Sequence, residues 1–488
     1  MIDNEQEIIA FLSDGASFGA PGAGVTRIDT HCSIVFLLRD RAYKLKRPIA
    51  FSALDYRTVA QRHAACRAEL GLNRRTAPEL YLGIRAICRR PDGALSFDAG
   101  GEVLDWVVVM RRFDQADRLD SLAETGRLGV DLVSHLADEI ADFHREAAPQ
   151  FEMGGAAGLR DAIERNHADQ ATVETILSRE AIDSLREASL DALDAHERNL
   201  DRRRTAGRAR RCHGDLRLAN ICLIDGRPTL FDGIEFGEEL VSIDVLFDLA
   251  FLLVDLLERR MDFAASHLLN RYLDATGDDE DLAILPLMAA IRMGTRGFTL
   301  AAGSQRRADV AEACRLRKEA QAHVALAASI LGERHPRLVA LGGLQSGTKS
   351  ALASALAAVL GPAVSVRVLS SEPVRRKLLN IRPHERPPHT AYEPQLTEQV
   401  HAAMTAKAKR LLGGGTTVIV DADFYRAANR DAIKDVASAV SVPFSGLWLE
   451  ETGSEDSIHD ALEWQKIAPP VLPADPLALA RSIADAIA

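Results

Sequence analysis

The first third of the chain has the hydrophobic pattern of β-strands with one helix among them. A β-rich apolar run at residues 34–38 is followed by a turn and a second run at 42–48, which together predict a hairpin. Residues 56–73 have the spacing of an amphipathic helix, and a proline-containing segment ends it. A third β-rich run covers residues 104–110. The pattern predicts a strand-rich segment that carries one long helix.

From about residue 127 the period changes to that of helices. An apolar stripe at residues 127–146 and a further pattern at 159–200 predict long helices, and helical segments continue to about residue 331. Near residue 334 the pattern restarts, and strand-like runs then alternate with helical ones, as in a doubly wound parallel sheet. The sequence therefore predicts a mixed α/β and α+β protein of two domains, residues 1–333 and 334–488.

Composition limits the classes of function. The 488 residues are 47% hydrophobic and 26% charged with a formal net charge of -11, which argues against a nucleic-acid partner. The six cysteines are scattered without metal-ligand spacing, as expected in a reducing compartment. No run of about 18 apolar residues occurs, and the acidic N-terminus lacks a signal-peptide pattern. We therefore expect a cytoplasmic protein without a membrane partner.

One stretch of the first domain carries the residues that phosphoryl transfer needs. Within residues 213–220 Asp215 precedes Asn220 by five positions, and Asp232 follows after a predicted strand, turn and strand. Such a set lets one aspartate accept the proton of the attacking hydroxyl, while the asparagine and the second aspartate hold Mg²⁺ on ATP. We predict that all three are catalytic and that Asn220 and Asp232 bind the metal. The alternative is a polar turn between two strands.

A nucleotide-binding set is predicted around the same point. Lys44 and Lys46 lie two apart on the second strand of the hairpin and so share one face, while Glu69 lies on the long helix. A kinase fold needs a strand lysine, held by a helix glutamate, to bind the α/β-phosphates. The sequence leaves open whether Lys44 or Lys46 pairs with Glu69. In such a fold, the run that ends at Met110 and Arg112 is the hinge where backbone groups meet adenine.

The second domain begins with the context of a phosphate-binding loop, namely a strand, a glycine-rich loop and a helix. The lysine and the hydroxyl at the start of this helix would serve the β/γ-phosphates and Mg²⁺. The predicted binding residues are Gly343, Gly347, Lys349, the metal ligand Ser350 and, at the end of a later strand, Asp421. Thr348 stands where the motif has its second glycine. We expect this β-branched residue to resist a positive φ and to crowd the phosphate.

Several stretches together resemble one bacterial family. They lie at residues 30–36, 42–48, 69–83, 110–113, 213–220, 231–236 and 248–251 in the first domain, and at 342–350, 371–378, 418–424 and 446–450 in the second. They are similar to fusion proteins that join an aminoglycoside phosphotransferase-like, and hence protein-kinase-like, domain to a P-loop domain of the AAA, zeta-toxin and gluconate-kinase type. The resemblance implies a bilobal kinase fold, with a small lobe at about 1–112 and a large lobe at about 113–333, followed by a P-loop NTPase fold.

The second domain departs from this family at chemically important positions. Glu372 stands where the family has an aspartate that could serve the acceptor, and Asp423 where a small hydroxyl residue is usual. The segment 451–456 is acidic, and no arginine occurs between Arg430 and Arg481, where the family carries lid arginines that clamp the transferring phosphate. The resemblance therefore implies a degenerate P-loop kinase.

The leading hypothesis is an ATP- and Mg²⁺-dependent phosphotransferase that acts in its first domain on a hydroxyl of a small molecule or a protein. The second domain would then sense nucleotide, act as a scaffold or be a relic. The main alternative is a nucleotide-binding regulatory or pseudokinase protein, and a further alternative places the chemistry in the P-loop domain alone. The acceptor and the oligomeric state do not follow from the sequence.

Overall fold

The chain forms two compact units, each with its own main sheet. The computed structural model describes residues 2–30, 32–51, 54–98, 100–333, 335–343, 347–362, 364–381, 385–449, 464–467 and 476–487. The first unit comprises Met1–Gly129, Ala147–Gln150 and Arg210–Ile243. The second unit comprises Val130–Glu146, Phe151–Ala209 and Asp244–Ala488.

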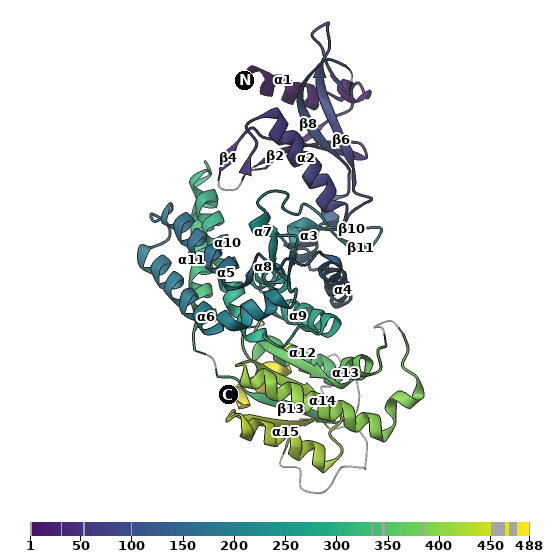
Figure 1. Cartoon of the computed structure of the whole chain (residues 1–488), viewed down its shortest axis with the longest axis vertical. Helices are drawn as coiled ribbons and strands as arrows, with labels where there is room; N and C mark the ends of the chain where they lie inside the picture. The colour runs from purple at the N-terminus through teal and green to yellow at the C-terminus, as the bar shows by residue number, and fades with distance from the viewer. Residues whose placement is uncertain are drawn as a thin grey trace. The chain divides into compact units, whose positions relative to one another are not determined.

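The first unit is built on a six-stranded antiparallel sheet of strand order β1-β2-β3-β8-β6-β7 (Figure 1). Its strands are β1 (Thr26–Asp29), β2 (Ser33–Leu38), β3 (Arg41–Lys46), β6 (Tyr81–Arg89), β7 (Leu95–Phe97) and β8 (Glu102–Arg111). The predicted hairpin is β2–β3. Alternate side chains such as Ile34, Phe36 and Leu45 form a buried core with α1 (Ile2–Ser13), because successive strand residues point to opposite faces.

The opposite face of this sheet packs against α2 (Val59–Asn73), where Cys66 contacts the set that contains Ala42 and Val108. The helix begins with a capping box: the Thr58 hydroxyl accepts from the Gln61 N–H at 3.2 Å, and the Gln61 side chain accepts from the Thr58 N–H at 2.9 Å. The short strands β4 (Ala50–Phe51) and β5 (Leu54–Asp55) precede it. The predicted helix is therefore confirmed, with a start three residues later than expected.

The stretch around Asp215 follows the predicted order of loop, strand, turn and strand. The hairpin turns at Asp225 and Gly226, which both have positive φ values (51° and 81°), as a tight two-residue turn requires. The elements of this part are β9 (Ala209–Arg211), η3 (Leu218–Asn220), β10 (Ile221–Ile224), β11 (Arg227–Leu230), α7 (Glu238–Val241) and β12 (Ser242–Asp244), with η2 (Gln115–Asp117) and α3 (Leu119–Glu124) earlier in the chain.

The second unit contains the predicted helical region. Its helices are α4 (Val130–Glu146), α5 (Gly155–Ala171), α6 (Arg179–Thr205), α8 (Val245–Glu258), α9 (Asp262–Thr276), α10 (Leu285–Gln305) and α11 (Val310–Leu331). The pattern at 159–200 proves to be two helices, because Ser178 accepts a hydrogen bond from the Ala181 N–H and so starts α6 anew. Asp244 likewise caps α8 by accepting from the Leu246 N–H.

The same unit contains a five-stranded parallel sheet of order β14-β15-β13-β16-β17 (Figure 1), which confirms the predicted doubly wound fold. Its strands are β13 (Leu338–Gly343), β14 (Val366–Ser370), β15 (Thr417–Asp421), β16 (Phe444–Leu449) and β17 (Gln465–Ile467). The accompanying helices are α12 (Gly347–Val359), α13 (Ser371–Leu378), α14 (Pro394–Gly413), α15 (Ala427–Ala439) and α16 (Pro476–Ile487). The core under α12 and α16 is apolar, and α9 packs against α12 and β14.

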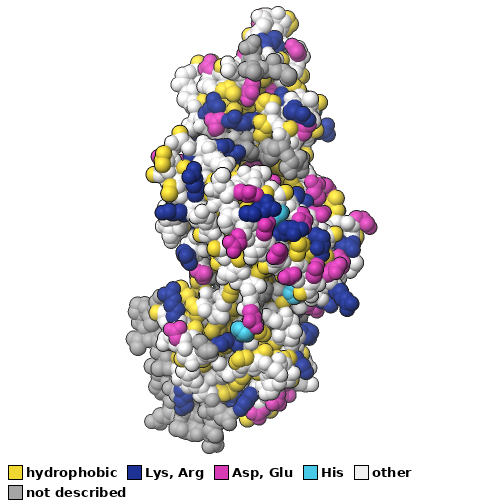
Figure 2. All heavy atoms as spheres, turned by 90° about the vertical axis from the view of Figure 1, so that its left-hand side faces the viewer, with side chains coloured by type: hydrophobic (Ala, Val, Ile, Leu, Met, Phe, Trp, Pro, Cys, Tyr) yellow, Lys and Arg dark blue, Asp and Glu magenta, His cyan; other side chains and the backbone are white. Residues whose placement is uncertain are grey.

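Positive and negative side chains are interspersed over the face shown in Figure 2. This agrees with the modest net negative charge of the sequence. Among the helices of the described residues, none is both long and apolar enough to cross a membrane.

Candidate active site

A cavity of about 490 Å³ in the first unit brings together most of the site residues predicted for the first domain. Its lining includes Lys44, Met110, Asp215, Asn220 and Asp232. The volume lies within the range of roughly 300–1,000 Å³ that is usual for small-molecule sites. Residues more than a hundred positions apart in the chain thus face one space, as the hypothesis of a single phosphoryl-transfer centre requires.

Glu69 pairs with both candidate lysines, which answers the question that the sequence left open. Its Oε1 accepts from Lys44 Nζ at 2.8 Å and its Oε2 accepts from Lys46 Nζ at 2.7 Å. Lys44 also donates to Asp232, and Lys46 to Glu235. The two lysines therefore differ in their second partner, and only Lys44 reaches the predicted metal ligand.

These charges are buried and mutually compensated. Burial lowers the pKa of Lys44, but the carboxylates of Asp232 and Glu69 more than offset burial and hold this pKa well above its usual value. The same balance with Glu69 and Glu235 raises the pKa of Lys46. Burial acts to raise the pKa of Glu69, yet the two ammonium groups lower it. All three groups are therefore ionised at neutral pH, and each lysine is shared between Glu69 and a second carboxylate.

The loop at residues 213–220 holds the Asp215 side chain through two of its own residues, Asn220 and Arg217. Asn220 donates its amide to the Asp215 backbone carbonyl at 2.9 Å and to its carboxylate at 2.8 Å. Arg217 donates to both carboxylate oxygens, at 2.7 and 3.0 Å. Burial acts to raise the pKa of Asp215, but the Arg217 guanidinium, together with His213 and the Asn220 amide, lowers that pKa overall. Gly214 has a φ of 84°, and a Cβ there would lie 3.0 Å from the Val241 side chain.

Asp232 adopts a left-handed backbone conformation, with a φ of 61°. Its N–H donates to the Tyr81 hydroxyl at 3.1 Å, and the next N–H, of Gly233, donates to the Asn73 side chain at 2.8 Å. A non-glycine residue in this region is uncommon and needs such support. Because Asn73 and Glu69 lie one turn apart on α2, this helix positions both the lysine partner and the predicted metal-binding segment.

The hinge residues line the same cavity. Met110 pairs with Ala42 and Tyr81 in the sheet, and the Arg112 N–H donates to the Asp40 carbonyl at 2.8 Å. The Arg112 N–H is thus already engaged at the end of the sheet. The structure places both residues at the cavity, as the sequence predicted for an adenine contact.

The oxygen donors of the first unit suit a hard divalent cation. Asp232 presents a carboxylate whose side chain is 41% exposed, and Asn220 commits its amide nitrogen to Asp215, so that its oxygen is the end suited to a metal. Mg²⁺ bound by these groups would neutralise charge on the phosphates of a nucleotide.

Sequence reasoning missed several residues that support this set. No role for Arg217 was predicted from the sequence, although a cation two positions after the candidate base could have indicated a partner for its carboxylate. Tyr56 donates to Glu235, so that this carboxylate, which also lines the cavity, is shared between Tyr56 and Lys46. No sequence motif indicates Tyr81 and Asn73, because they support the backbone at Asp232 and Gly233 through contacts between residues far apart in the chain.

In the second unit, three residues predicted to bind phosphate and Mg²⁺ converge at the carboxyl end of the parallel sheet: Lys349, Ser350 and Asp421. Lys349 Nζ donates to the carbonyls of Gly343 at 3.1 Å and of Ala422 at 2.6 Å, and lies 3.5 Å from Asp421 Oδ1. Burial lowers the pKa of Lys349, and Asp421 offsets this only in part. Ser350 donates to Asp421 Oδ2 at 2.8 Å. The lysine, the hydroxyl and the aspartate thus meet as the sequence predicted.

Thr348 does not adopt a positive φ. It lies within α12, one residue after Gly347, and is absent from the described residues with positive φ. This agrees with the resistance to positive φ expected of a β-branched residue, and the crowding of the phosphate stays a prediction. Gly343, in contrast, has a φ of 115°, and a Cβ there would lie 2.5 Å from the Leu449 carbonyl oxygen. Residues 344–346 of the loop and the acidic segment 451–456 lie outside the described residues.

The other departures of this domain also have partners. Glu372 accepts from Arg376 at 3.1 Å and from the Tyr392 hydroxyl at 3.3 Å. Asp423 accepts from the His401 ring at 3.0 Å, and this hydrogen bond lowers the pKa of its carboxyl. Both acidic groups therefore lie in polar networks near the end of the sheet.

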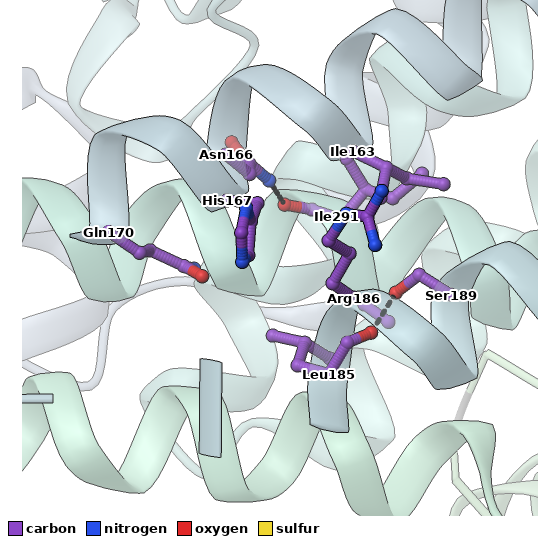
Figure 3. Close-up of a pocket in the computed structure, with 9 residues that line it drawn as sticks. Ile163, Asn166, His167, Gln170, Leu185, Arg186, Ser189 and Ile291 are labelled. Atoms are coloured by element: carbon purple, nitrogen blue, oxygen red, sulfur yellow. Dashed lines mark hydrogen bonds between the residues drawn. The ribbon is translucent and has the colours of Figure 1, made fainter. Parts of the chain in front are cut away.

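A much smaller cavity lies among α5, α6 and α10 (Figure 3). Its volume is about 10 Å³, room for roughly one water molecule. Asn166 donates to the Ile291 carbonyl at 2.7 Å and Ser189 to the Leu185 carbonyl at 2.7 Å, so that its polar side chains are engaged between the helices. This cavity cannot hold a nucleotide.

Comparisons with known proteins cover both parts of the chain. A family described as an AAA domain matches residues 338–454, which confirms the P-loop prediction. Uncharacterized protein Rv2004c of Mycobacterium tuberculosis is 30% identical over 430 residues, which cover 84% of this chain and 82% of that protein. Among solved structures, a choline/ethanolamine kinase family protein from Mesorhizobium loti has a TM-score of 0.42 and 15% identity, over 68% of this chain and 95% of that chain. The APS kinase CysC of Mycobacterium tuberculosis has a TM-score of 0.24 and 16% identity, over 31% of this chain and 97% of that chain.

Proposed function

This chain belongs to the same family as Rv2004c of Mycobacterium tuberculosis, and we propose its main function from the site in the first unit. The protein is an ATP- and Mg²⁺-dependent phosphotransferase that transfers the γ-phosphoryl group to a hydroxyl of a small molecule or protein. The chemistry takes place in the cavity of the first unit. The observation that carries the proposal is the meeting of Lys44, Glu69 and Asp232 with Asp215 and Asn220 at that cavity.

Each residue of the set has a role that its contacts support. Lys44 binds phosphate oxygens, and its ammonium is kept charged and oriented by Glu69. Asn220 and Asp232 hold Mg²⁺, which supplies positive charge to the phosphates. Asp215 is the base, because its lowered pKa keeps it ionised and ready to accept the proton of the acceptor hydroxyl.

Arg217 adds a positive charge to the loop at residues 213–220. Its guanidinium bridges both oxygens of Asp215, so that it orients the carboxylate. A fixed cation beside the base also favours the negative charge that spreads over the transferred phosphoryl group. Arg217 is therefore a positioning residue with an electrostatic contribution.

A turnover measurement tests the proposal. ADP formation from Mg·ATP with a panel of hydroxyl acceptors, and autophosphorylation, would be compared among wild type, Asp215→Ala and Lys349→Ala. We expect Asp215→Ala to lower the rate by about 10²–10⁴-fold and Lys349→Ala to retain most of it. The reverse order would contradict a first-unit active site. Equal ADP formation in all three proteins would mean that neither residue takes part in turnover.

A second function is favoured by Lys349, Ser350 and Asp421. We propose that this site binds nucleotide independently, and so lets the second unit sense it. Equilibrium dialysis with a non-hydrolysable ATP analogue should give two sites per chain in wild type and one in Lys349→Ala. A single site in both proteins would exclude nucleotide binding at the P-loop.

A further inference from the structure

The two lysines of β3 pair with the same glutamate but have different surroundings. Lys44 donates to Glu69 Oε1 at 2.8 Å and to Asp232. Lys46 donates to Glu69 Oε2 at 2.7 Å and to Glu235. The Lys44 side chain is 12% exposed and lines the candidate active site, whereas Lys46 is 1% exposed and is not among the described residues that line this cavity. Only one of the two ammonium groups therefore reaches the space proposed for the nucleotide.

Lys46 is enclosed by partners that have little exposure themselves. Its second acceptor, Glu235, has a 7% exposed side chain and also accepts from the Tyr56 hydroxyl. The centre of the Tyr56 ring lies 5.0 Å from Lys46 Nζ, within the range of a cation–π contact. Glu235 has no other ion pair among the described residues, so that the departure of Lys46 would leave this carboxylate as an unpaired charge. The Lys46 ammonium is therefore fixed in place.

Lys44 has an accessible second partner. Asp232 lines the same cavity with a 41% exposed side chain, and it is the proposed ligand of Mg²⁺. A divalent cation on this carboxylate meets the Lys44 ammonium, which donates to the same group. Like charges on one carboxylate repel each other, and the phosphate oxygens of a nucleotide offer the ammonium new acceptors. Lys44 therefore has both the room and the driving force to exchange Asp232 for phosphate.

This exchange would weaken the hold on Glu69 if Lys44 were its only partner. Glu69 is 0% exposed, and each of its two oxygens accepts from one lysine. While Lys44 changes its second partner, Lys46 keeps its hydrogen bond to Glu69 Oε2 and so keeps the buried carboxylate compensated. Through Glu235, the same ammonium also holds the segment that begins at Asp232. The two lysines are thus suited to different tasks.

We propose that Lys44 and Lys46 have separate roles in nucleotide binding. Lys44 is the exchangeable cation: it competes with the divalent cation for Asp232 and passes to the phosphate oxygens, while Glu69 remains its partner. Lys46 is a positioning residue that does not touch the nucleotide and that fixes Glu69 and Glu235 during the exchange. The step to phosphate rests on the proposed function, whereas the competition for Asp232 does not.

Binding of Mn²⁺ to the full chain without nucleotide tests the competition. Free Mn²⁺ is measured by electron paramagnetic resonance in wild type and Lys44→Met. We expect Lys44→Met to bind one Mn²⁺ about tenfold tighter, the size of effect that one neighbouring charge has on a carboxylate. Adding Asp232→Asn to Lys44→Met should abolish this gain, and Lys318→Met, at an exposed position of α11, should show none. Equal Mn²⁺ affinity in wild type and Lys44→Met would overturn the proposal.

Phosphotransfer kinetics test the role of Lys46. Lys46→Met should lower kcat by about tenfold and leave KM for Mg·ATP within about twofold, because alignment is lost while no contact to the nucleotide is removed. Lys44→Met should lower kcat and also raise this KM by about tenfold. Lys46→Arg should recover part of kcat, since a guanidinium can donate to Glu69 and Glu235 together. A purely structural role would lower the folded fraction, measured by circular dichroism, without this split between kcat and KM.

The two measurements separate this inference from the proposed function. Tighter Mn²⁺ binding by Lys44→Met in a protein without phosphotransferase activity would keep the competition for Asp232 and reject the function. A KM that rises equally in Lys46→Met and Lys44→Met would place Lys46 at the nucleotide and overturn the separation of roles. Should Lys46→Met fail to fold, Lys46→Gln, which retains a hydrogen-bond donor, answers the same question.

Discussion

The carboxylate of Asp215 is held between burial, which raises its pKa, and the guanidinium of Arg217, which lowers it. Burial is the largest single effect, but Arg217 together with His213 and Asn220 lowers the pKa overall, so that the folded protein keeps Asp215 ionised to a lower pH than a free aspartate. Arg217 follows Asp215 by two positions in the chain, and two nitrogens of its guanidinium donate to the carboxylate. The state of the proposed base is thus set at the scale of single residues.

The pH dependence of the reaction should report this balance. A carboxylate base is active while it is ionised, that is, at any pH above its pKa. Because the pKa of Asp215 is lowered, activity should be lost only when the pH falls through this lowered pKa. In Arg217→Ala the effect of burial remains without its compensation, so that the acidic limb of the kcat/KM profile should move to higher pH. Arg217→Lys should restore part of the shift. An acidic limb at the same pH in wild type and Arg217→Ala would contradict the assignment of Asp215 as the titrating base.

At the scale of elements, α2 organises the candidate active site. Its buried face supplies Glu69 to the two lysines of β3 and, one turn later, Asn73 to the backbone after Asp232. The capping box at Thr58 fixes where the helix begins, and hence which residues face the sheet. A strand, a helix and a hairpin loop are thus joined by side chains from a single helix face.

Removal of the charge on Glu69 should destabilise this assembly. Glu69→Gln weakens a buried hydrogen bond to each of Lys44 and Lys46, in a site where the Glu69 side chain is 0% exposed, while each lysine keeps its second carboxylate. The expected cost is about 1.5–3 kcal/mol, the usual value of a hydrogen bond to a charged group. Thermal unfolding followed by circular dichroism should show a clear fall in the midpoint. The exposed variant Glu79→Gln should change stability by less than about 0.5 kcal/mol, and an equal effect of the two would refute the argument.

At the scale of the whole molecule, the C-terminal sheet and the helices before it belong to one compact unit. Arg367 of β14 is fully buried and donates to Asp274 at 2.5 Å and to Asp279 at 3.0 Å. The side chain of Asn270 on α9 accepts from the Val368 N–H at 2.8 Å and from Arg367 at 3.1 Å. A boundary near residue 334, as predicted from the sequence, therefore separates two segments that share a polar, buried junction.

Substitution of Arg367 should weaken this junction. Arg367→Met leaves two carboxylates without their buried partner, with an expected loss of about 3–5 kcal/mol. The exposed Arg315→Met is the matched control and should have little effect. Combining Arg367→Met with Asp274→Asn should recover part of the stability, since one unpaired charge is removed. Thermal unfolding is compared among wild type, Arg367→Met, Arg315→Met and the double variant. An unfolding midpoint of Arg367→Met equal to that of wild type would show that the junction does not contribute to stability.

The elements were largely predictable because burial in regular structure is periodic. The hairpin of β2 and β3, the helix α2 and the parallel strands follow from alternation and helical spacing, which are local properties of the chain. The order loop–strand–turn–strand around Asp215 was predictable for the same reason. The split between α5 and α6 was not, since Ser178 reads as an ordinary polar residue until its side chain caps a helix.

The sequence by itself determined which residue types could carry out phosphoryl transfer, and that they lie on elements able to present them. Tertiary structure decided which groups meet. Both lysines of β3 pair with Glu69 because its carboxylate has two oxygens, each of which accepts from one ammonium group. The packing of α2 that brings Glu69 to β3 is a tertiary contact, which no local sequence pattern contains. The hydrogen bond from the Gly233 N–H to Asn73 of α2 was equally undetermined, because it joins segments distant in the chain that only folding brings together.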